Sequence, residues 1–391
     1  MISFEQAIEI INNQKSNLDI SDIILTEAYN YVLSQDIFSD IDMPPFDKAA
    51  MDGFACRIED LSNDLEIVEN IIAGKQPNVK IHQNQCTSIT TGSPVPEGAN
   101  CVIKIEDVQV FENKFVRFVA DKTNLNICYR AEDIKKEQLL LKKGTLLQPC
   151  HLAILASAGI YNVPIYTKPK VGIIVTGNEI LEPYEKISSA KIRNSNAYQL
   201  IGQLQKTACI PLYGGLVADN KESIKNKIVE LYKNTSVILI TGGASVGEFD
   251  LTESILKELG FNILFNKVSI QPGKPVIFAQ KDNLFCFGLS GNPVSSFFQF
   301  EFFVSQLLKK VTGSNVCDYN LHLPLNTSYS RKKAERTQFI LLKIVNQQVK
   351  LIDFNGSAHI NSLADADAIG IIPADINTLK EGELIEIKLL K

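Results

Sequence analysis

Apolar residues in the central part of the chain alternate between two spacings, which predicts strands followed by helices. Short β-branched runs predict buried strands at 171–175, 209–213 and 236–240. Apolar residues at helical spacing follow each run, at 195–206, 221–232 and 251–259. Runs at 276–279 and 285–288 predict a hairpin, and Asn292 with Pro293 opens a helix over 294–310. This alternation indicates an α/β domain with a mainly parallel sheet.

The flanking regions follow other patterns. Residues 1 to about 42 are expected to be helical, because apolar positions recur there at helical spacing and 25–33 continues in that style. From 65 to about 147 the runs are short, β-like and separated by turns. A helix is expected over 152–158, ended by Gly159. After Gly313 the pattern becomes β again, with runs at 321–325, 337–345, 349–354, 368–372 and 384–389, which predicts a small C-terminal sheet or barrel.

Composition narrows the function classes. The 391 residues carry a net charge of −5, so nonspecific nucleic-acid binding is not expected. The first residues lack a secretory signal and no long uncharged apolar run occurs, which predicts a soluble protein. The 8 cysteines are scattered without a Cys-x-x-Cys pair, which favours a reducing compartment over a zinc site or disulfide framework. The 4 dispersed histidines disfavour a Ser-His-Asp hydrolase.

A glycine-rich loop, Thr241-Gly-Gly-Ala-Ser-Val-Gly-Glu-Phe-Asp250, lies between a predicted strand and a predicted helix. Asp250-Leu-Thr-Glu253 resembles a capping box that would start this helix. Glycines permit a close backbone approach, and a helix start offers free N–H groups and a positive dipole end. The loop therefore favours a bound phosphate, with an ordinary strand–helix turn as the alternative.

Other polar residues follow the ends of the same predicted strands. Ligands of open parallel sheets bind at the carboxyl ends of the strands. These positions hold three carboxylates, Glu179, Asp219 and Asp250. They also hold two loops compatible with phosphate, one containing Ser245 and one at Ser290-Gly-Asn-Pro293, and Lys274 on a Pro-Gly-Lys-Pro turn. Carboxylates that share Mg²⁺ with a phosphate, and a lysine that offsets phosphate charge, predict a phosphorylated-ligand site. Neither G-x-G-x-x-G nor the P-loop pattern occurs.

Several motifs together resemble a known family. They are, in chain order, Ala49-Ala-Met-Asp-Gly-Phe-Ala55, Thr91-Gly-Ser-Pro-Val-Pro-Glu-Gly-Ala-Asn100, Arg130-Ala-Glu-Asp-Ile134, Thr176-Gly-Asn-Glu179, the glycine-rich loop, Pro272-Gly-Lys-Pro275 and Ser290-Gly-Asn-Pro293. In this order, over nearly the whole length, they resemble the molybdopterin molybdenumtransferases, the MoeA and gephyrin E-domain family.

The resemblance implies a multidomain α/β plus β fold. Its domains would be a discontinuous helical linker (1–42 and 143–168), an inserted β-rich domain (43–142), an α/β molybdopterin- and nucleotide-binding domain (169–313) and a C-terminal β-barrel (314–391). It further implies a cytoplasmic homodimer that inserts molybdenum from molybdate into adenylylated molybdopterin, with Mg²⁺-dependent release of AMP. The molybdopterin adenylyltransferase would be a partner, and neither nucleic acid nor a membrane would be.

The resemblance also assigns roles to residues. Glu179, Asp219 and Asp250 would hold the metal. Asp52 and Asp133 would face the molybdate pocket from the other subunit with Arg130 as support, and would be catalytic together with Asp219, Asp250 and Lys274. The remaining substrate-binding residues would be Thr176, Gly242, Gly243, Ser245, Gly247, Lys267, Pro272, Gly273, Pro275, Ser290, Gly291, Asn292, Pro293, Arg336 and Ser357.

One departure from the family pattern concerns the anion pocket, since Gln271 stands where many members have lysine. Two alternative functions stay open at this point. The chain could be a non-catalytic gephyrin-like scaffold of the same fold, which a turnover assay would distinguish. It could also be a pterin- or nucleotide-handling enzyme with another substrate, which ligand binding in competition with molybdate would separate.

Overall fold

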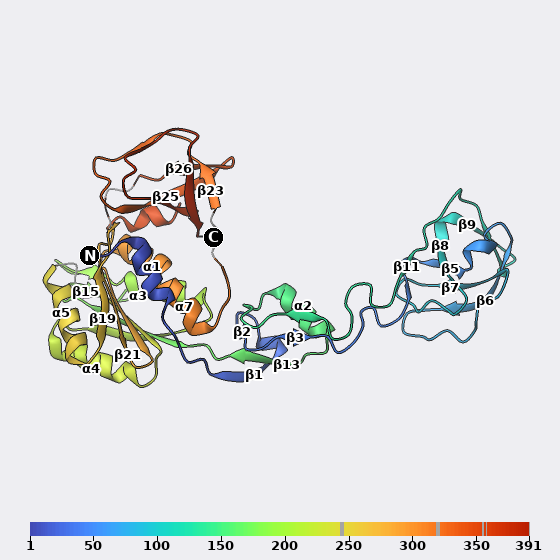
Figure 1. Cartoon of the computed structure of the whole chain (residues 1–391), viewed down its shortest axis with the longest axis horizontal. Coiled ribbons are helices and arrows are strands. Elements are labelled where there is room, and N and C mark those ends of the chain that lie inside the picture. The colour runs from blue at the N-terminus through green and yellow to red at the C-terminus, as the bar shows by residue number, and fades with distance from the viewer. Residues whose placement is uncertain (243–245, 318–320, 354–355, 357, 391) are drawn as a thin grey trace. The chain divides into compact units, whose positions relative to one another are not determined.

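The computed structural model describes residues 1–242, 246–317, 321–353, 356 and 358–390, with the backbone alone at 246–250. The chain divides into two compact units (Figure 1). Unit 1 comprises Met1–Gln35, Lys143–Leu152 and Asn162–Lys391, and unit 2 comprises Asp36–Lys142 and Ala153–Tyr161. Helix α2 (Pro149–Ser157) contains residues of both units. Among the described residues, no helix is both long and apolar enough to span a membrane.

A six-stranded sheet forms the centre of unit 1. Its order is β17 (Ile210–Val217), β14 (Lys170–Thr176), β18 (Val237–Gly242), β22 (Leu284–Leu289), β21 (Pro275–Lys281) and β19 (Asn262–Lys267). The first four strands are parallel, whereas β21 runs antiparallel to β22 and β19. The mainly parallel sheet and the hairpin are therefore confirmed.

Helices cover both faces of this sheet, because successive side chains of a buried strand point to opposite sides. Ile173 and Val175 face a core formed with α1 (Phe4–Asn12), α3 (Asn196–Gln205), α6 (Pro293–Gln299), η4 (Phe300–Val304) and α7 (Ser305–Thr312). Ile174 faces a second core formed with α4 (Lys221–Tyr232) and α5 (Val246–Glu258) (Figure 1). The predicted helix over 294–310 exists, but η4 in its middle is π-helical.

The N-terminal region differs from its prediction. Helix α1 is present, with a capping box between Ser3 and Gln6. The helical prediction for 25–33 is wrong, because only the 3₁₀ turn η1 (Leu25–Glu27) is helical there. β1 (Ile20–Ile24) and β2 (Val32–Leu33) instead flank β13 (Asn162–Tyr166) in a three-stranded sheet. Pairing with a strand more than a hundred residues away overrides a short amphipathic spacing that suits either structure.

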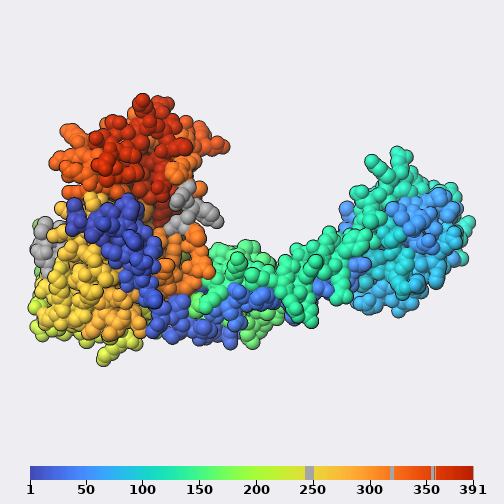
Figure 2. Space-filling view, in the orientation of Figure 1, coloured from blue at the N-terminus to red at the C-terminus, as the bar shows by residue number. Residues whose placement is uncertain are grey.

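A second sheet of unit 1 contains most of the described C-terminal strands. Its strands are β20 (Ile270–Gln271), β25 (Thr337–Val345), β27 (Ala368–Ile372), β29 (Leu384–Leu389) and β23 (Leu321–Pro324), with β26 (Gln348–Leu351) paired to β25. The region also contains the pair β24 (Tyr329–Ser330) and β28 (Thr378–Leu379) and the turn η5 (Ile360–Leu363). Phe339 stacks on Phe302 at 4.1 Å between ring centroids, and Phe4 meets both rings edge-on. Accordingly, Figure 2 shows the N-terminal residues (blue) against the orange and red surfaces of unit 1.

Unit 2 has its own β core. Its main sheet is β8 (Cys101–Lys104), β5 (Gly53–Cys56), β7 (Gln85–Ile89), β6 (Leu65–Ile71), β10 (Phe115–Phe118) and β9 (Val108–Phe111). Two short pairs accompany it, β11 (Ile127–Cys128) with β4 (Lys48–Ala49) and β12 (Leu139–Leu141) with β3 (Ile37–Phe38), and so do the turns η2 (Ile58–Asp60) and η3 (Ile105–Asp107).

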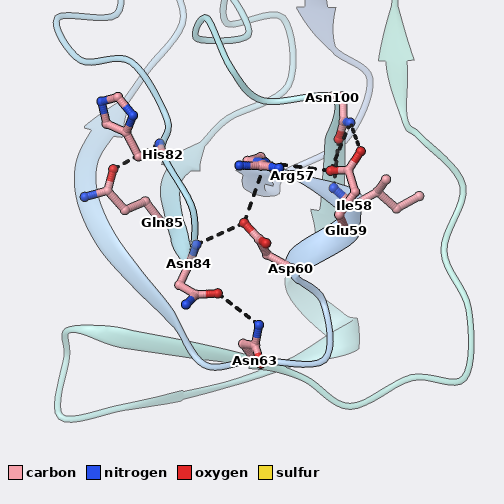
Figure 3. A network of polar contacts seen from close by, with 9 residues as sticks. All are labelled: Arg57, Ile58, Glu59, Asp60, Asn63, His82, Asn84, Gln85 and Asn100. Carbon is pink, nitrogen blue, oxygen red and sulfur yellow. Dashed lines mark hydrogen bonds and ion pairs between the residues drawn. The ribbon is translucent and has the colours of Figure 1, made fainter.

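A buried carboxylate organises the turns of this core (Figure 3). Asp60 is 4% exposed, accepts a hydrogen bond from the Asn84 N–H at 2.9 Å and lies 3.7 Å from the Arg57 guanidinium. Asn63 in turn donates to the Asn84 side chain at 3.0 Å. The network joins the turn η2 to the start of β7, and its polar groups satisfy one another inside a small domain.

Candidate functional site

The carboxyl ends of the four parallel strands lie along one edge of the central sheet. Thr176 at the end of β14 pairs with Gly242 at the end of β18, and Thr241 pairs with Leu289 at the end of β22. β21 runs the opposite way, so Pro275 at its start, and hence Lys274, belongs to this same edge. The structure thus brings together the predicted residues Thr176, Gly242, Lys274 and Ser290, although the set spans more than a hundred residues of sequence.

Gly242 meets the β14 backbone too closely for any side chain. A Cβ atom at this position would lie 1.9 Å from the Thr176 carbonyl oxygen, and its φ is +134°. Glycine is required at this position, since only glycine combines this conformation with this contact between two strands. Gly243 and Ser245 of the predicted phosphate loop lie outside the described residues.

Helix α5 begins at Val246, immediately after that loop. The prediction that Asp250 caps the helix is wrong, because the helix begins four residues earlier and Asp250 and Gly247 both lie within it. A glycine lowers helix stability by about 1 kcal/mol, which the packing of Ile255 and Leu256 against the sheet offsets. The free N–H groups of the first turn consequently lie directly beside the loop, which strengthens the argument for an anion there.

Two of the predicted metal ligands come from neighbouring loops. A Cβ on Gly177 would lie 3.0 Å from both carboxylate oxygens of Glu179, so this carboxylate folds back toward the end of β14. The Asp219 N–H approaches the Asn178 side-chain oxygen at 3.4 Å, which brings the loop after β17 against the loop after β14. Glu179 and Asp219 therefore belong to one acidic end of the sheet edge.

A hydrogen-bond network between two tyrosine hydroxyls and the Glu182 carboxylate holds the loop that contains Glu179. Glu182 accepts hydrogen bonds from the hydroxyls of Tyr213 and Tyr198, the latter at 3.0 Å. Asn194 donates to the Tyr213 hydroxyl at 2.8 Å. Burial, together with the Glu182 carboxylate, raises the pKa of Tyr213 well above its usual value, so this hydroxyl stays a donor. The short strand β15 (Ile180–Leu181), which pairs with β16 (Ile192–Arg193), is fixed in this way.

The loop Ser290-Gly-Asn-Pro293 is fixed by residues that the sequence analysis missed. Asn196 donates to the Thr241 hydroxyl and to the Gly291 carbonyl, both at 2.9 Å, and the Thr241 hydroxyl donates to the Ser290 carbonyl at 3.0 Å. Pro293 begins α6 as predicted, and Asn292 is its N-cap without a side-chain hydrogen bond. The only sequence signal for Asn196 was its place in the first turn of a predicted helix.

The other end of the edge is basic. Lys267 lies at the end of β19 directly opposite Pro275, beside Lys274. Thr337 pairs with Ile270 and donates its N–H to the Ser269 carbonyl, which places Arg336 beside Ser269, two residues after Lys267. Three of the predicted cations thus belong to backbone segments that meet at this end. Gln271 is exposed beside them, and Ser357 lies outside the described residues.

Two strands, β18 and β22, separate the acidic end at β14 from the basic end at β21. With neighbouring strands about 4.8 Å apart, the two ends are roughly 15 Å apart. An elongated ligand could thus bind with a metal-bound phosphate at one end and a second anion at the other.

A second group of predicted residues lies in unit 2. Asp52 accepts hydrogen bonds from the Thr91 N–H at 2.6 Å and the Thr91 hydroxyl at 2.8 Å. Both hydrogen bonds lower the pKa of Asp52 below its ordinary value, and the bond from the Thr91 backbone N–H has the larger effect. Asp133 and Gly92 line one cavity of about 650 Å³, and Thr91 is the neighbour of Gly92. Thr91, the first residue of a motif quoted above, thus holds Asp52, and Asp133 lines the cavity that the neighbouring Gly92 also lines.

Arg130 is placed as a support in the same unit. Its side chain donates to the Asp42 carboxylate at 2.8 Å, and its N–H donates to Asp47 at 2.7 Å. The hydrogen bond from the Lys136 N–H lowers the pKa of Asp42 most, and the hydrogen bond from the Arg130 side chain lowers it further. The Arg130 charge is thus engaged with Asp42 within unit 2.

The described residues contain no group of three or more His, Cys, Asp and Glu side chains that could hold a metal by themselves. Mg²⁺ is commonly held by one or two carboxylates together with water and substrate phosphate. Glu179 and Asp219 at the acidic end fit that requirement, whereas the Asp250 side chain lies outside the described residues.

All eight cysteines are free, including Cys209, whose burial raises its pKa to about 12.

The central α/β sheet with its glycine-rich loop, together with the β-rich regions on either side of it in the chain, defines a multidomain α/β class of protein. Family models match residues 2–159 (MoeA N-terminal region, domain I and II), 172–310 (probable molybdopterin binding domain) and 325–390 (MoeA C-terminal region, domain IV). The chain belongs to the molybdopterin molybdenumtransferase (MoeA) family.

Individual relatives agree with this membership. A molybdopterin molybdenumtransferase of Bacillus subtilis is 33% identical over 94% of this chain and 89% of its own length. One from Staphylococcus aureus is 30% identical over 99% of this chain and 95% of its own length. The crystal structure of the molybdopterin biosynthesis MoeA protein from Pyrococcus horikoshii superposes with a TM-score of 0.86 at 30% identity, covering all of both chains.

Proposed function

We propose that this protein is a molybdenum insertase, which uses adenylylated molybdopterin and molybdate, inserts molybdenum into the dithiolene and releases AMP. Family membership makes it a transferase of molybdenum cofactor biosynthesis. The observation that supports the finer reaction is that one sheet edge carries carboxylates at one end and lysines and an arginine at the other. Each end suits a different charged part of the two substrates.

At the acidic end, Glu179, Asp219 and Asp250 would hold Mg²⁺ beside the adenylyl phosphate. Bound there, the ion would supply positive charge that makes the phosphate easier to attack. Gly242, Gly243, Ser245 and Gly247 would cradle the phosphate through the loop and the first turn of α5. The Glu182–Tyr213 network keeps the Glu179 loop in place without touching the substrate.

At the basic end, Lys267, Lys274 and Arg336 would bind molybdate, with Ser357 and the Pro272–Pro275 backbone as further contacts. Molybdate is a dianion, so a group of cations offsets its charge where water is partly excluded. Ser290–Pro293 lies between the two ends and would contact the pterin part.

Asp52 and Asp133 would complete the site from a second copy of the chain, so we further propose a homodimer. A mixing test examines this directly. Glu179→Gln and Asp133→Ala are each expected to be inactive. In randomly mixed dimers, half are heterodimers with one intact site of two, so about a quarter of the native activity should return. No recovery, with subunit exchange verified by mass, would contradict a shared site.

The catalytic proposal is tested by AMP release from adenylylated molybdopterin with molybdate and Mg²⁺. The native chain should turn over, and Asp250→Ala and Glu179→Gln should lose at least about a hundredfold. Glu230→Gln, on the exposed face of α4, is the matched control and should keep full activity. A folded native protein without molybdate-dependent AMP release would refute the insertase and favour the scaffold alternative. We also propose that it acts in the cytoplasm after the molybdopterin adenylyltransferase, consistent with its free cysteines.

A further inference from the structure

A single buried glutamine connects the two loops on either side of the β21–β22 hairpin. Gln299 is the last residue of α6, where the helix widens into the π-helical turn η4, and it is 0% exposed. Its side-chain oxygen accepts from the Ser290 N–H at 2.7 Å. Its side-chain nitrogen donates to the carbonyls of Gly273 and Pro275, both at 2.8 Å. Both amide hydrogens of this side chain are therefore used.

These two carbonyls belong to the neighbours of Lys274. The carbonyl of Lys274 itself accepts from the Val268 N–H at 3.0 Å, so three successive carbonyls are held. A Cβ at Gly273, whose φ is +93°, would lie 3.1 Å from the Gln299 nitrogen, so glycine at this position lets the amide approach. Because its backbone is fixed at three points, the Lys274 side chain starts from a defined position.

The surroundings of Gln299 are otherwise apolar. Phe298, Phe300 and Phe303 are all buried, so a polar group in this helix is costly unless every hydrogen bond is made. An apolar residue of similar size would pack there without that requirement. The amide is thus suited to joining the loops rather than to filling the core, and a π-helical turn directs it toward them.

We propose that Gln299 is a positioning residue for the insertase reaction. It holds the Lys274 loop and the Ser290 loop at a fixed separation, so that the Lys274 ammonium group, which would bind molybdate, and the pterin-contacting loop act on one substrate geometry. It touches no substrate itself. This proposal rests on the assignment of Lys274 to the molybdate pocket under the proposed function.

The matched control is Gln203, which is 6% exposed on α3 and donates to Glu301 at 2.8 Å against the same helix. Gln299→Met and Gln203→Met remove a buried amide of equal size from the same layer. Two quantities should be measured for each: the molybdate KM and kcat of AMP release, and amide hydrogen exchange of 270–276 and of Ser290.

For Gln299→Met we expect faster exchange in both loops and a molybdate KM raised about tenfold or more with a smaller change in kcat, since a misplaced charged group loses its alignment. Gln203→Met should leave the molybdate KM unchanged. If Gln299→Met does not fold, Gln299→Glu is the second variant: in this apolar surrounding its carboxyl stays protonated, so it accepts from Ser290 but donates one hydrogen bond to the Lys274 loop instead of two, and only exchange of 270–276 should rise.

Unchanged exchange in 270–276 would overturn the connection between the loops. Faster exchange with an unchanged molybdate KM would overturn the positioning role. Lys274→Ala separates this failure from a failure of the proposed site. If Lys274→Ala raises the molybdate KM and Gln299→Met does not, only the role of Gln299 is refuted. If neither variant changes the molybdate KM, the molybdate pocket itself is wrongly assigned.

Discussion

Replacing Gly242 by alanine tests the close approach of β14 and β18 on which the candidate site depends. The new Cβ would lie 1.9 Å from the Thr176 carbonyl oxygen, and the φ of +134° is a conformation that L-residues rarely adopt. Such strain costs about 1–3 kcal/mol. Relieving the contact by moving a packed strand costs about 1–3 kcal/mol more. The free energy of unfolding should thus fall by about 2–6 kcal/mol.

Thermal unfolding followed by circular dichroism measures this effect. At about 2–4 °C per kcal/mol, the unfolding midpoint should fall by roughly 5–20 °C. AMP release should be lost as well, because the phosphate loop begins at this residue. Gly202→Ala is the control: it lies on the exposed side of α3, where nothing comes within 4 Å of a new Cβ, and it should stabilise the protein by about 0.5–1 kcal/mol.

The opposite result would refute the reasoning. A Gly242→Ala protein that unfolds within about 2 °C of the native chain and still releases AMP would mean that the two strand ends do not meet in this way. An equal fall of the unfolding midpoint in both glycine variants would show that the assay reports a general sensitivity of the fold to substitution rather than this contact.

Three further predictions follow from local contacts. Thr91→Val removes the second-largest cause of the low pKa of Asp52 and should raise it part of the way to the ordinary 3.8, as read from a carboxyl NMR titration. Because folding lowers the pKa of Asp52, the stabilising contribution of this carboxylate is present above about pH 4 and disappears as the pH falls through the pKa of the folded state. The variant should therefore lose less stability on acidification than the native chain. An unchanged titration of Asp52 would contradict the contact with the Thr91 hydroxyl. Gln271→Lys adds a cation to the basic end and should lower the molybdate KM severalfold at low salt, with the gain lost at high salt, whereas a salt-independent KM would place molybdate elsewhere. Asp60→Ala removes a buried carboxylate and the hydrogen bond that it accepts from Asn84, and should cost about 1–3 kcal/mol in urea unfolding of unit 2. The exposed Glu59→Ala should cost less, and equal effects would remove the special role of Asp60.

Prediction from the sequence succeeded where a local pattern carries the whole signal. The helix at 221–232 and the strands at 337–345, 368–372 and 384–389 have the predicted bounds. Buried strands and amphipathic helices leave their periodicity in the chain itself. The prediction failed at 25–33 and at Asp250, where strand pairing and the continuation of α5 depend on residues distant in sequence or on packing.

The candidate site divides in the same way. The motifs supplied candidate residues for the chemistry, since Glu179, Asp219, Lys274 and Asp52 carry charges that suit metals, phosphates and oxyanions. The residues that hold the loops, Asn196, Gln299 and Glu182, carried no pattern, because a hydrogen bond between residues 26 to 95 positions apart has no sequence period.

The sequence alone therefore determined the α/β class, the β-rich flanks and the family to which the chain belongs. Only the tertiary structure decided that Thr176, Gly242 and Pro275 share one edge, because strand order and direction are set by packing on both faces of the sheet. It also decided which buried amides hold the loops, since a polar side chain is stable inside only where the fold supplies its partners.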